Sequence, residues 1–511
     1  MKPSLATALG LPLAVGAALL AHRFVLDLEL MGWDSYPLIA ASAASSLAEL
    51  LTSLTQELMG GRYPEGSFYR PVTSLLFSLD HALSGLDPAA YQRTNLALHV
   101  AGVVAVFALA RHWLGARAGC VVAALVFAIH PLQLETVPVA ARRADMLFTL
   151  FLVLALRVQP LGEVASWWRL CLGALLVLLS AASKDTGAVA LPVVAAALWL
   201  LPASGDAAAR SRRCARRAAL PALAFGLFFA LRTSVLGGIG GHPGSSVFSG
   251  ALQGVLSAPD FARSLLMPQP WSVHPPLDAL LCALLAAGLG VGLAAGWGRG
   301  GVGSELEEPR PAPARVAGFA AFWILCLLAI TGVSGERAAW YAVPFLPPYA
   351  LILGLAVDAG AAALRGHRAG GRARAAAAAA GVAALVLLTS HLRFSPLFHS
   401  YPEWQELSRQ ERGFLDRFIT SVSAAGLGTS VTVPGLPLGT GAPLERVGVR
   451  SALCLSDYSV EAYAELALPD LPLRVLLRTT AQASPPTPGL VTVDAIPLAS
   501  PVLRPAPQGA R

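Results

Sequence analysis

The chain has little charge and almost no lysine. Only 13% of its 511 residues are charged, whereas 55% are hydrophobic, and the mean hydropathy is +0.61. Lys2 and Lys184 are its two lysines, so the net charge of +7 comes from arginine. A composition this apolar excludes an ordinary soluble enzyme and a disordered chain, and it indicates a membrane protein.

Cysteine and histidine are also too few and too scattered to build a metal or disulfide site. Four of the six cysteines lie in apolar runs, one lies in a basic loop, and Cys454 lies alone near the end. Their spacing matches neither a disulfide framework nor a zinc site. The residues alone therefore require no cofactor.

Apolar stretches close to the roughly 20 residues that cross a bilayer recur along the chain. They predict an α-helical polytopic membrane fold with eleven spans, at residues 4–21, 94–112, 117–133, 141–157, 168–183, 187–202, 219–236, 279–297, 316–334, 341–361 and 375–391. Arginine collects in every second loop, as in the run from Arg210 to Arg217, and this is typical of cytoplasmic loops. The pattern predicts a cytoplasmic N-terminus and an extracytoplasmic C-terminus. The first span lacks a small-x-small cleavage site, so we expect an uncleaved anchor.

Two long outward loops interrupt the spans, at residues 22–93 and 237–278. In the first, the stretch Leu38 to Leu58 mixes apolar and small residues with two glutamates, which predicts a helix lying along the membrane interface. The second is rich in glycine at its start and in proline at its end, which predicts an irregular loop.

The residues after the last span form a third outward segment, so the predicted domains are a membrane domain, 1–394, and a small extracytoplasmic α/β domain, 395–511. Helical spacing runs from Trp404 to Val422, and the alternating runs 430–433 and 490–493 are typical of short strands. The proline-rich end is expected to be loose.

Ionisable residues in or beside spans are costly and are functional candidates by default. Here they gather at the outward ends of the predicted helices: Asp34, Arg70, Glu135, Arg142, Arg143, Asp145, Lys184, Glu336 and Arg337, with Tyr341 nearby. Outward cations can bind a lipid-linked phosphate, and a carboxylate beside them can take a proton from an attacking hydroxyl. Each of these groups can equally be an interfacial anchor or a helix-joining ion pair. Asp34 is the residue with no evident packing role.

Other polar residues favour structural or lipid-binding roles. Asn95 and His99 lie four residues apart and share a helix face, which predicts hydrogen bonds to a neighbouring helix. His130 is a further structural candidate. The basic run from Arg210 to Arg217 is best explained by orientation and anionic membrane lipids rather than by nucleic acid.

Taken together, these motifs resemble the GT-C membrane glycosyltransferases, and within them the branch of protein O-mannosyltransferases and transmembrane, tetratricopeptide-repeat O-mannosyltransferases with their bacterial relatives. The resemblance covers roughly residues 20 to 395. Its elements are a first-loop acidic motif at Trp33-Asp34-Ser35-Tyr36-Pro37-Leu38-Ile39, an RP element at Tyr69-Arg70-Pro71, Asn95 with His99, an HP…E…RAD segment from His130-Pro131 through Glu135 to Arg143-Ala144-Asp145, Ser183-Lys184-Asp185, and Glu336-Arg337 with Tyr341.

The resemblance implies an inverting transferase that takes a sugar from a polyprenyl-phosphate donor at the outer membrane face. It implies that Asp34 is the general base. The residues implied to bind substrate are Arg143, Lys184 and Arg337 at the donor phosphate, Glu135 and Asp145 around the pocket, and Arg70 and Tyr341 beside them. The acceptor would be a protein, lipid or glycan hydroxyl, and the bacterial relatives imply an inner membrane with the C-terminal domain in the periplasm.

The chain departs from the family in two ways. Ser35 stands where a second acidic residue is common, which weakens the case for a divalent metal, and repeats with a 34-residue period are absent after the last span. Two other functions stay open. A transporter or lipid-linked-sugar flippase would place polar groups near the bilayer midplane, where this sequence has few. A catalytically inert relative that binds a partner would have the same helices.

Overall fold

The structure is a computed structural model, and it describes residues 5–32, 34–63, 66–162, 165–202, 206–241, 247–266, 290, 310–334, 339–365, 371–400, 402–425, 430–432, 455–469, 474–476 and 490–492. The chain divides into two compact units. The first consists of Met1–Arg23, Leu96–Leu134 and Ala144–His399, and the second consists of Phe24–Asn95, Glu135–Arg143 and Ser400–Arg511. The second unit thus joins the predicted first loop to the C-terminal segment.

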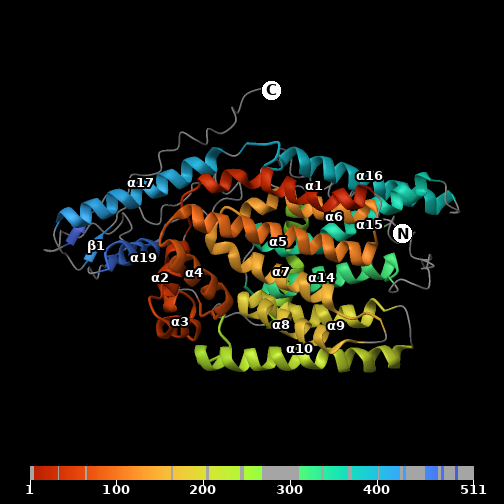
Figure 1. The fold of residues 1–511 in the computed structure, drawn as a ribbon, viewed down its shortest axis with the longest axis horizontal. Coiled ribbons are helices and arrows are strands. Elements are labelled where there is room, and N and C mark those ends of the chain that lie inside the picture. The colour runs from red at the N-terminus through yellow and green to blue at the C-terminus, as the bar shows by residue number, and fades with distance from the viewer. Residues whose placement is uncertain are drawn as a thin grey trace. The chain divides into compact units, whose positions relative to one another are not determined.

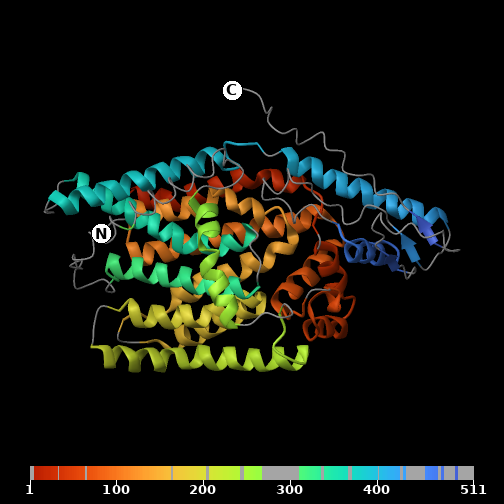
Figure 2. The ribbon, with the colours of Figure 1, turned by 180° about the vertical axis from the view of Figure 1, so that it is seen from behind.

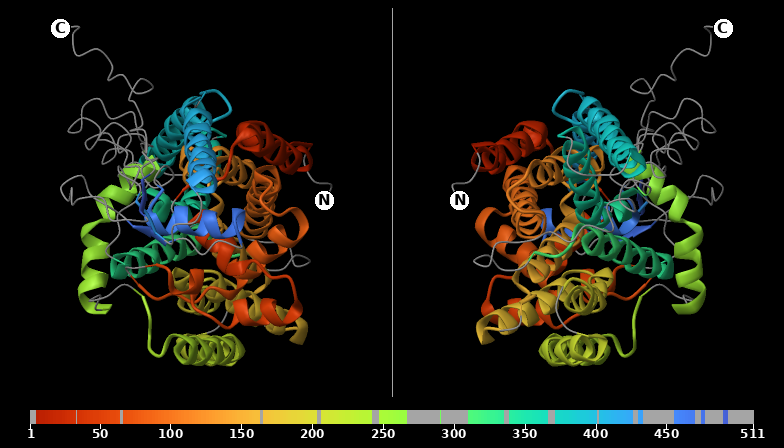
Figure 3. Two further views of the ribbon diagram at one scale, coloured as in Figure 1. Left: turned by 90° about the vertical axis from the view of Figure 1, so that its left-hand side faces the viewer. Right: turned by 90° about the vertical axis from the view of Figure 1, so that its right-hand side faces the viewer.

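The first unit is helical throughout its described residues. Its helices are α1 (Leu5–His22), most of α5 (Pro88–Leu114), α6 (Ala118–Ile129), α7 (Arg143–Val158), α8 (Trp167–Ser183), η5 (Asp185–Val189), α9 (Ala190–Leu200), α10 (Ala207–Leu236), α11 (Val247–Leu256), α12 (Ala258–Leu266), α14 (Pro313–Ser334), η6 (Ala339–Phe345), α15 (Leu346–Leu364) and α16 (Gly371–Phe394). Helices α8 and α9 pack against α10, and α15 packs between α6 and α16 (Figures 1 and 2). Figure 3 shows α10 end-on, whereas α11 and α12 are seen from the side.

Seven of the described helices are long and apolar enough to cross a membrane: Ala8–Asp27, Pro88–Leu114, Ala118–Glu135, Ala207–Leu236, Pro313–Val333, Ala339–Leu364 and Arg374–Phe394. Each coincides with a predicted span. The predicted fourth, fifth and sixth spans are the shorter helices α7, α8 and α9, and the predicted eighth, 279–297, lies almost entirely outside the described residues. The chain is a helical membrane protein with several crossings, and the count of eleven stays a prediction.

The prediction of an irregular loop over 237–278 is wrong in part, because α11 and α12 lie within it. Helix α11 packs against α14 at Gly254, where an added Cβ atom would overlap the carbonyl oxygen of Leu328. Small residues let the backbones of membrane helices approach closely. Glycine therefore marks a helix contact here, where the sequence favoured a loop. The preceding Gly237, with φ +65°, does end α10 in a left-handed conformation.

The described helices of the second unit are short except for α17. They are η1 (Arg23–Asp27), α2 (Ser35–Ser42), α3 (Leu47–Leu54), η2 (Leu58–Gly61), α4 (Pro71–Ser84), the first turns of α5, η4 (Ala140–Arg142), α17 (Pro402–Ala425) and α19 (Asp457–Ala467); η3 (Pro131–Glu135) ends at its edge. Tyr36, Ile39, Phe77, Phe418 and Val460 are part of one apolar core in this unit. Helix α17 confirms the helix predicted over 404–422.

The stretch predicted as one interfacial helix, Leu38 to Leu58, is instead divided between α2 and α3. Most of α2 is buried, whereas α3 exposes Leu47 and Leu51. A serine explains the break, since Ser46 lies in extended conformation and its hydroxyl accepts the backbone N–H of Glu49 to start α3.

The second unit also contains a three-stranded parallel sheet in the order β2-β1-β3, made of β1 (Ser430–Thr432), β2 (Arg474–Leu476) and β3 (Leu490–Thr492). In the register of the sheet, Val431 pairs with Val475 on one side and Val491 on the other. The strands predicted at 430–433 and 490–493 are therefore present. The sequence reading missed β2.

Candidate functional site

Asp34 lies at the start of α2, in the second unit. Its backbone carbonyl accepts the N–H of Leu38, but its carboxylate does not cap the helix. The next residues of the helix, Ser35 and Tyr36, are fully buried, and their hydroxyls bond back to the carbonyls of Met31 and Leu30. The buried helix therefore fixes the backbone of Asp34, while the half-buried carboxylate makes no capping bond.

The carboxylate of Asp34 meets the C-terminal segment of the same unit. The phenol of Tyr458, on α19, donates a hydrogen bond to Oδ1 of Asp34 at 3.0 Å. Two residues before Asp34, the backbone N–H of Gly32 donates to Oε2 of Glu411, on α17, at 3.1 Å. Neither Tyr458 nor Glu411 was predicted from the sequence, and both come from a segment more than 370 residues away.

Helix α19 is held against the first loop by contacts other than Asp34. The rings of Tyr36 and Tyr463 meet edge to face with centroids 4.9 Å apart. Arg62, after η2, makes an ion pair with Glu465 at the end of α19. The position of Tyr458 is therefore set by the packing of the rest of α19, not by its bond to Asp34 alone.

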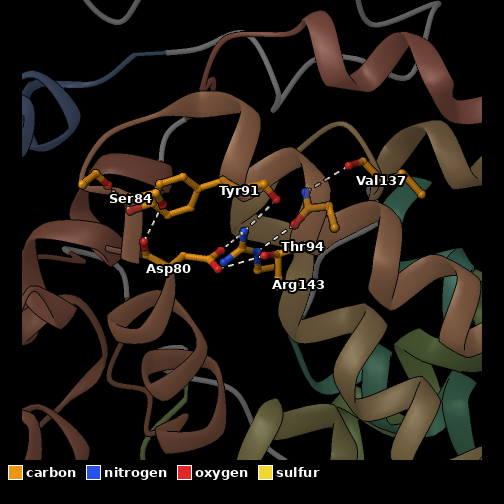
Figure 4. A network of polar contacts seen from close by, with 8 residues as sticks. Asp80, Ser84, Tyr91, Thr94, Val137 and Arg143 are labelled. Carbon is orange, nitrogen blue, oxygen red and sulfur yellow. Dashed lines mark hydrogen bonds and ion pairs between the residues drawn. The ribbon is translucent and has the colours of Figure 1, made fainter. Parts of the chain in front are cut away.

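Arg143 is fully buried at the centre of a polar network in the second unit (Figure 4). Its guanidinium makes an ion pair with Asp80 of α4 at 2.7 Å and donates to Oδ1 of Asn95 and the carbonyl of Tyr91. Thr94 donates to the same carboxylate at 2.8 Å. Because its charge is neutralised by a buried partner, Arg143 is better explained as a structural residue than as the donor-phosphate ligand that the resemblance implies.

Asp80 was not among the predicted residues, although a signal existed. It is the acidic residue of the otherwise apolar or neutral stretch 71–84. Asn95, predicted to be structural, donates to the carbonyl of Val137 at 3.0 Å as well as accepting from Arg143. The network ties α4 and the start of α5 to the segment before α7.

The remaining predicted residues of this unit have different surroundings. Arg70 lies at the start of α4 with its guanidinium 4.8 Å from the ring centre of Phe68. Glu135 is buried, with 8% of its surface exposed. Helix α2 packs against both α4 and η4, so Asp34, Arg70 and the segment 140–143 belong to neighbouring elements of one unit.

Lys184, Asp145 and Tyr341 form a cluster in the first unit. The ammonium group of Lys184 lies 2.6 Å from Oδ1 of Asp145 and 4.6 Å from the ring centre of Tyr341. The next residue, Asp185, makes an ion pair with Arg232 of α10. These three predicted site residues are therefore close together, in the first unit rather than in the unit of Asp34.

The two predicted structural histidines are both buried in the first unit. His99 bonds to the carbonyl of Ala128 at 2.9 Å, and His130 bonds to the carbonyl of Leu265 at 3.0 Å. The imidazole of His391 lies 4.3 Å from that of His130, centre to centre, and bonds to the same carbonyl. Each ring thus joins two helices.

Trp33, Glu336 and Arg337 lie outside the described residues, so the predicted role of Arg337 stays a prediction. Within the described parts of the chain, no group of three or more His, Cys, Asp or Glu side chains could hold a metal ion. A carboxylate oriented by a phenol can accept a proton from a hydroxyl, and this is the chemistry that the described residues around Asp34 offer.

The chain resembles known protein O-mannosyltransferases over a short segment. It is 38% identical over 88 residues to "Protein O-mannosyl-transferase TMTC2" of Homo sapiens, a match covering 17% of this chain and 10% of that protein. It is 32% identical over 126 residues to "Protein O-mannosyl-transferase Tmtc1" of Drosophila melanogaster, covering 24% and 14%. The matched part is thus about a tenth to a seventh of the length of these relatives. The resemblance predicted from the motifs is confirmed.

No model of a protein family matches the chain. Among solved structures, ArnT from Cupriavidus metallidurans bound to undecaprenyl phosphate is similar with a TM-score of 0.48 and 15% identity, over 91% of this chain and 85% of that one. The oligosaccharyltransferase of Archaeoglobus fulgidus is similar with a TM-score of 0.43 and 13% identity, over 93% and 62%.

Proposed function

We propose that the chain is a membrane glycosyltransferase that moves a sugar, mannose by its resemblance, from a polyprenyl-phosphate donor to a hydroxyl at the outer membrane face, with Asp34 as general base. The observation that carries the proposal is the carboxylate of Asp34, which stands at the start of the buried helix α2 and is not used to cap it. The short match to protein O-mannosyltransferases supports the same chemistry.

In the proposed step, the acceptor oxygen forms a bond to the anomeric carbon of the donor sugar while its proton passes to Asp34. The bond between that carbon and the phosphate oxygen breaks, and polyprenyl phosphate leaves with the electron pair. Attack opposite to the leaving group inverts the anomeric centre. Asp34 has Oδ1 occupied by the Tyr458 phenol, so Oδ2 is the oxygen that would accept the proton.

The developing negative charge on the leaving phosphate needs cations, which arginine and lysine supply. Lys184 and Arg337 remain our candidates for this role. Arg70, which starts the helix packed against that of Asp34, is a further candidate to bind substrate. Lys184 already has Asp145 as its partner, so binding a phosphate would require it to share or exchange that contact. Arg143 is left out of this set because of its buried ion pair with Asp80.

The proposal includes the topology from the sequence: eleven spans, a cytoplasmic N-terminus, and residues 395–511 as an extracytoplasmic cap, periplasmic in a bacterial inner membrane. In that orientation Asp34 and the cap lie on the same side of the bilayer. A protein hydroxyl is the proposed acceptor because the relatives are named protein O-mannosyl-transferases.

The test is sugar transfer by the full chain in lipid nanodiscs. The donor is undecaprenyl-phosphate mannose with labelled sugar, the acceptors are serine- and threonine-rich peptides, and release of free mannose to water is counted as well. Asp34→Asn should lower turnover at least about 100-fold, the usual contribution of a general base, with unchanged insertion and melting temperature.

The matched control is Asp87→Asn, which alters an exposed aspartate of the same unit. Equal turnover of the two variants would remove Asp34 as the base.

A further inference from the structure

The C-terminal segment reaches the proposed catalytic residue directly. Helix α19 carries Tyr458, whose hydroxyl oxygen lies 3.0 Å from Oδ1 of Asp34. We propose that Tyr458 is a positioning residue that holds the carboxylate of Asp34 in the orientation needed to take a proton from the acceptor. This inference rests on the proposed function. It adds Tyr458 to the site as the residue that the C-terminal segment contributes.

The geometry favours this role over an incidental surface contact. Asp34 has two side-chain dihedral angles and no helix-capping bond, so nothing in its own helix fixes the carboxylate plane. Tyr458 is half-buried, and its helix begins in a capping box in which Ser456 and Ser459 bond to each other's backbone. A donor held rigidly by its helix therefore meets a carboxylate that makes no capping bond. Ordering this pair costs less entropy than ordering two flexible groups.

The protonation state of the phenol is suited to donation. Burial, and next the negative charge of Asp34, raise the pKa of Tyr458 well above its ordinary value. The hydroxyl thus keeps its proton at every pH at which the enzyme would work. A hydrogen bond from it stabilises the ionised carboxylate, which is the form that acts as a base.

Helix α19 is held against α2 by contacts that do not involve Tyr458. Tyr463, five residues further along α19, lies against Tyr36 of α2, and Arg62 pairs with Glu465. These contacts hold α19 in place even when Tyr458 loses its hydroxyl. Tyr458→Phe therefore removes the hydroxyl and its hydrogen bonds but keeps the ring, and Tyr463→Phe is a matched control that removes a phenol from the same helix without touching Asp34.

The experiment compares pH–rate profiles of mannose transfer for the wild type, Tyr458→Phe and Tyr463→Phe in nanodiscs. Loss of the hydrogen bond should lower kcat about tenfold, keep the KM for undecaprenyl-phosphate mannose within about twofold, and move the acid limb of the profile up by about one pH unit. Tyr463→Phe should match the wild type. A purely structural role for Tyr458 would lower activity without moving the limb.

Other ionisable groups on the elements packed against α2 are shared by all three proteins, so the difference between profiles isolates Tyr458. They include Glu49 of α3, Asp80 and His81 of α4, Arg142 of η4 and Glu461 and Glu465 of α19, with Arg62, Arg70 and Glu411 on neighbouring segments. Where Tyr458→Phe fails to insert, a fluorinated tyrosine at position 458 gives the converse test, because its phenol is a stronger donor and should move the limb to lower pH.

Two results distinguish failure of the positioning role of Tyr458 from failure of the proposed function. An inactive Asp34→Asn together with a Tyr458→Phe profile identical to that of Tyr463→Phe would overturn the positioning role and leave the base intact. Full turnover by Asp34→Asn would overturn both, since Tyr458 would then position a carboxylate that takes no part in transfer.

Discussion

The guanidinium of Arg143 and the carboxylate of Asp80 lie 2.7 Å apart, with the arginine side chain wholly buried and the aspartate 9% exposed. The rings of Phe77 and Tyr91 lie 4.6 and 5.2 Å from the guanidinium. Arginine is suited to such a place because its flat, weakly hydrated group both stacks and donates in several directions. The pair therefore acts as a buried structural link, called the clamp below, between α4 and the start of α7.

We predict that Asp80→Asn destabilises the protein by about 3 kcal/mol, because it leaves a buried guanidinium without its counter-ion. The matched control is Asp87→Asn, which breaks the exposed pair between Asp87 and Arg93 and should cost less than about 1 kcal/mol. Melting of both variants in detergent measures the difference. Adding Arg143→Met to Asp80→Asn should recover part of the loss. Equal melting temperatures for the two aspartate variants would contradict the clamp.

A second prediction concerns Glu411, the buried carboxyl that accepts the N–H of Gly32. Burial raises the pKa of Glu411 from 4.5 to about 8, and the hydrogen bond from Gly32 opposes this only in part. Between these two pH values the folded protein holds a proton that the unfolded chain releases. Stability is therefore fully present below pH 4.5 and is lost as the pH rises through about 8, by a few kcal/mol in all.

Glu411→Gln should remove this dependence, since an amide keeps the shape and does not ionise. We expect the melting temperature of the wild type to fall between pH 5 and pH 8.5 more than that of Glu411→Gln. Glu406→Gln, on the exposed side of the same helix, is the control and should follow the wild type. A wild type and Glu411→Gln that fall in parallel would show that another group carries the pH dependence.

The apolar pattern predicted most of the helices because burial in a bilayer acts on long runs of residues. Each of the seven long apolar helices coincides with a predicted span, and Asp34 stands at the start of a helix that its carboxylate does not cap. The burial of Glu411 in α17 could also have been predicted from the sequence. Glu411 lies four residues after Leu407 and three before Phe414, on the same helix face, and both are buried. A charge on the apolar face of a helix predicts a partner.

Long-range contacts could not be predicted in this way. The partner of Asp34 is a tyrosine in a short helix more than 400 positions later, and the partner of Arg143 is an aspartate 63 positions earlier in the chain. Spacing along one segment carries no information on which distant segment packs against it. The pairing of Arg143 with Asp80, rather than with a donor phosphate, depends on such packing.

Gly254 lies in the segment 237–278, which the sequence predicted to be an irregular loop, and it is a close contact between α11 and α14. At Gly254 of α11 an added methyl group would overlap the carbonyl oxygen of Leu328 on α14, and backbone atoms cannot rotate away as a side chain does. Gly254→Ala should therefore push the two helices apart and cost about 1 to 3 kcal/mol.

Gly226, in the middle of α10, is the matched control because an added methyl group there meets nothing within 4 Å. Alanine is the better helix former, so Gly226→Ala should leave stability unchanged or raise it by up to about 1 kcal/mol. The fraction of each variant that stays monodisperse in detergent after heating measures the effect. If both variants survive heating equally, the close approach of α11 and α14 does not stabilise the protein, and the glycine has another role.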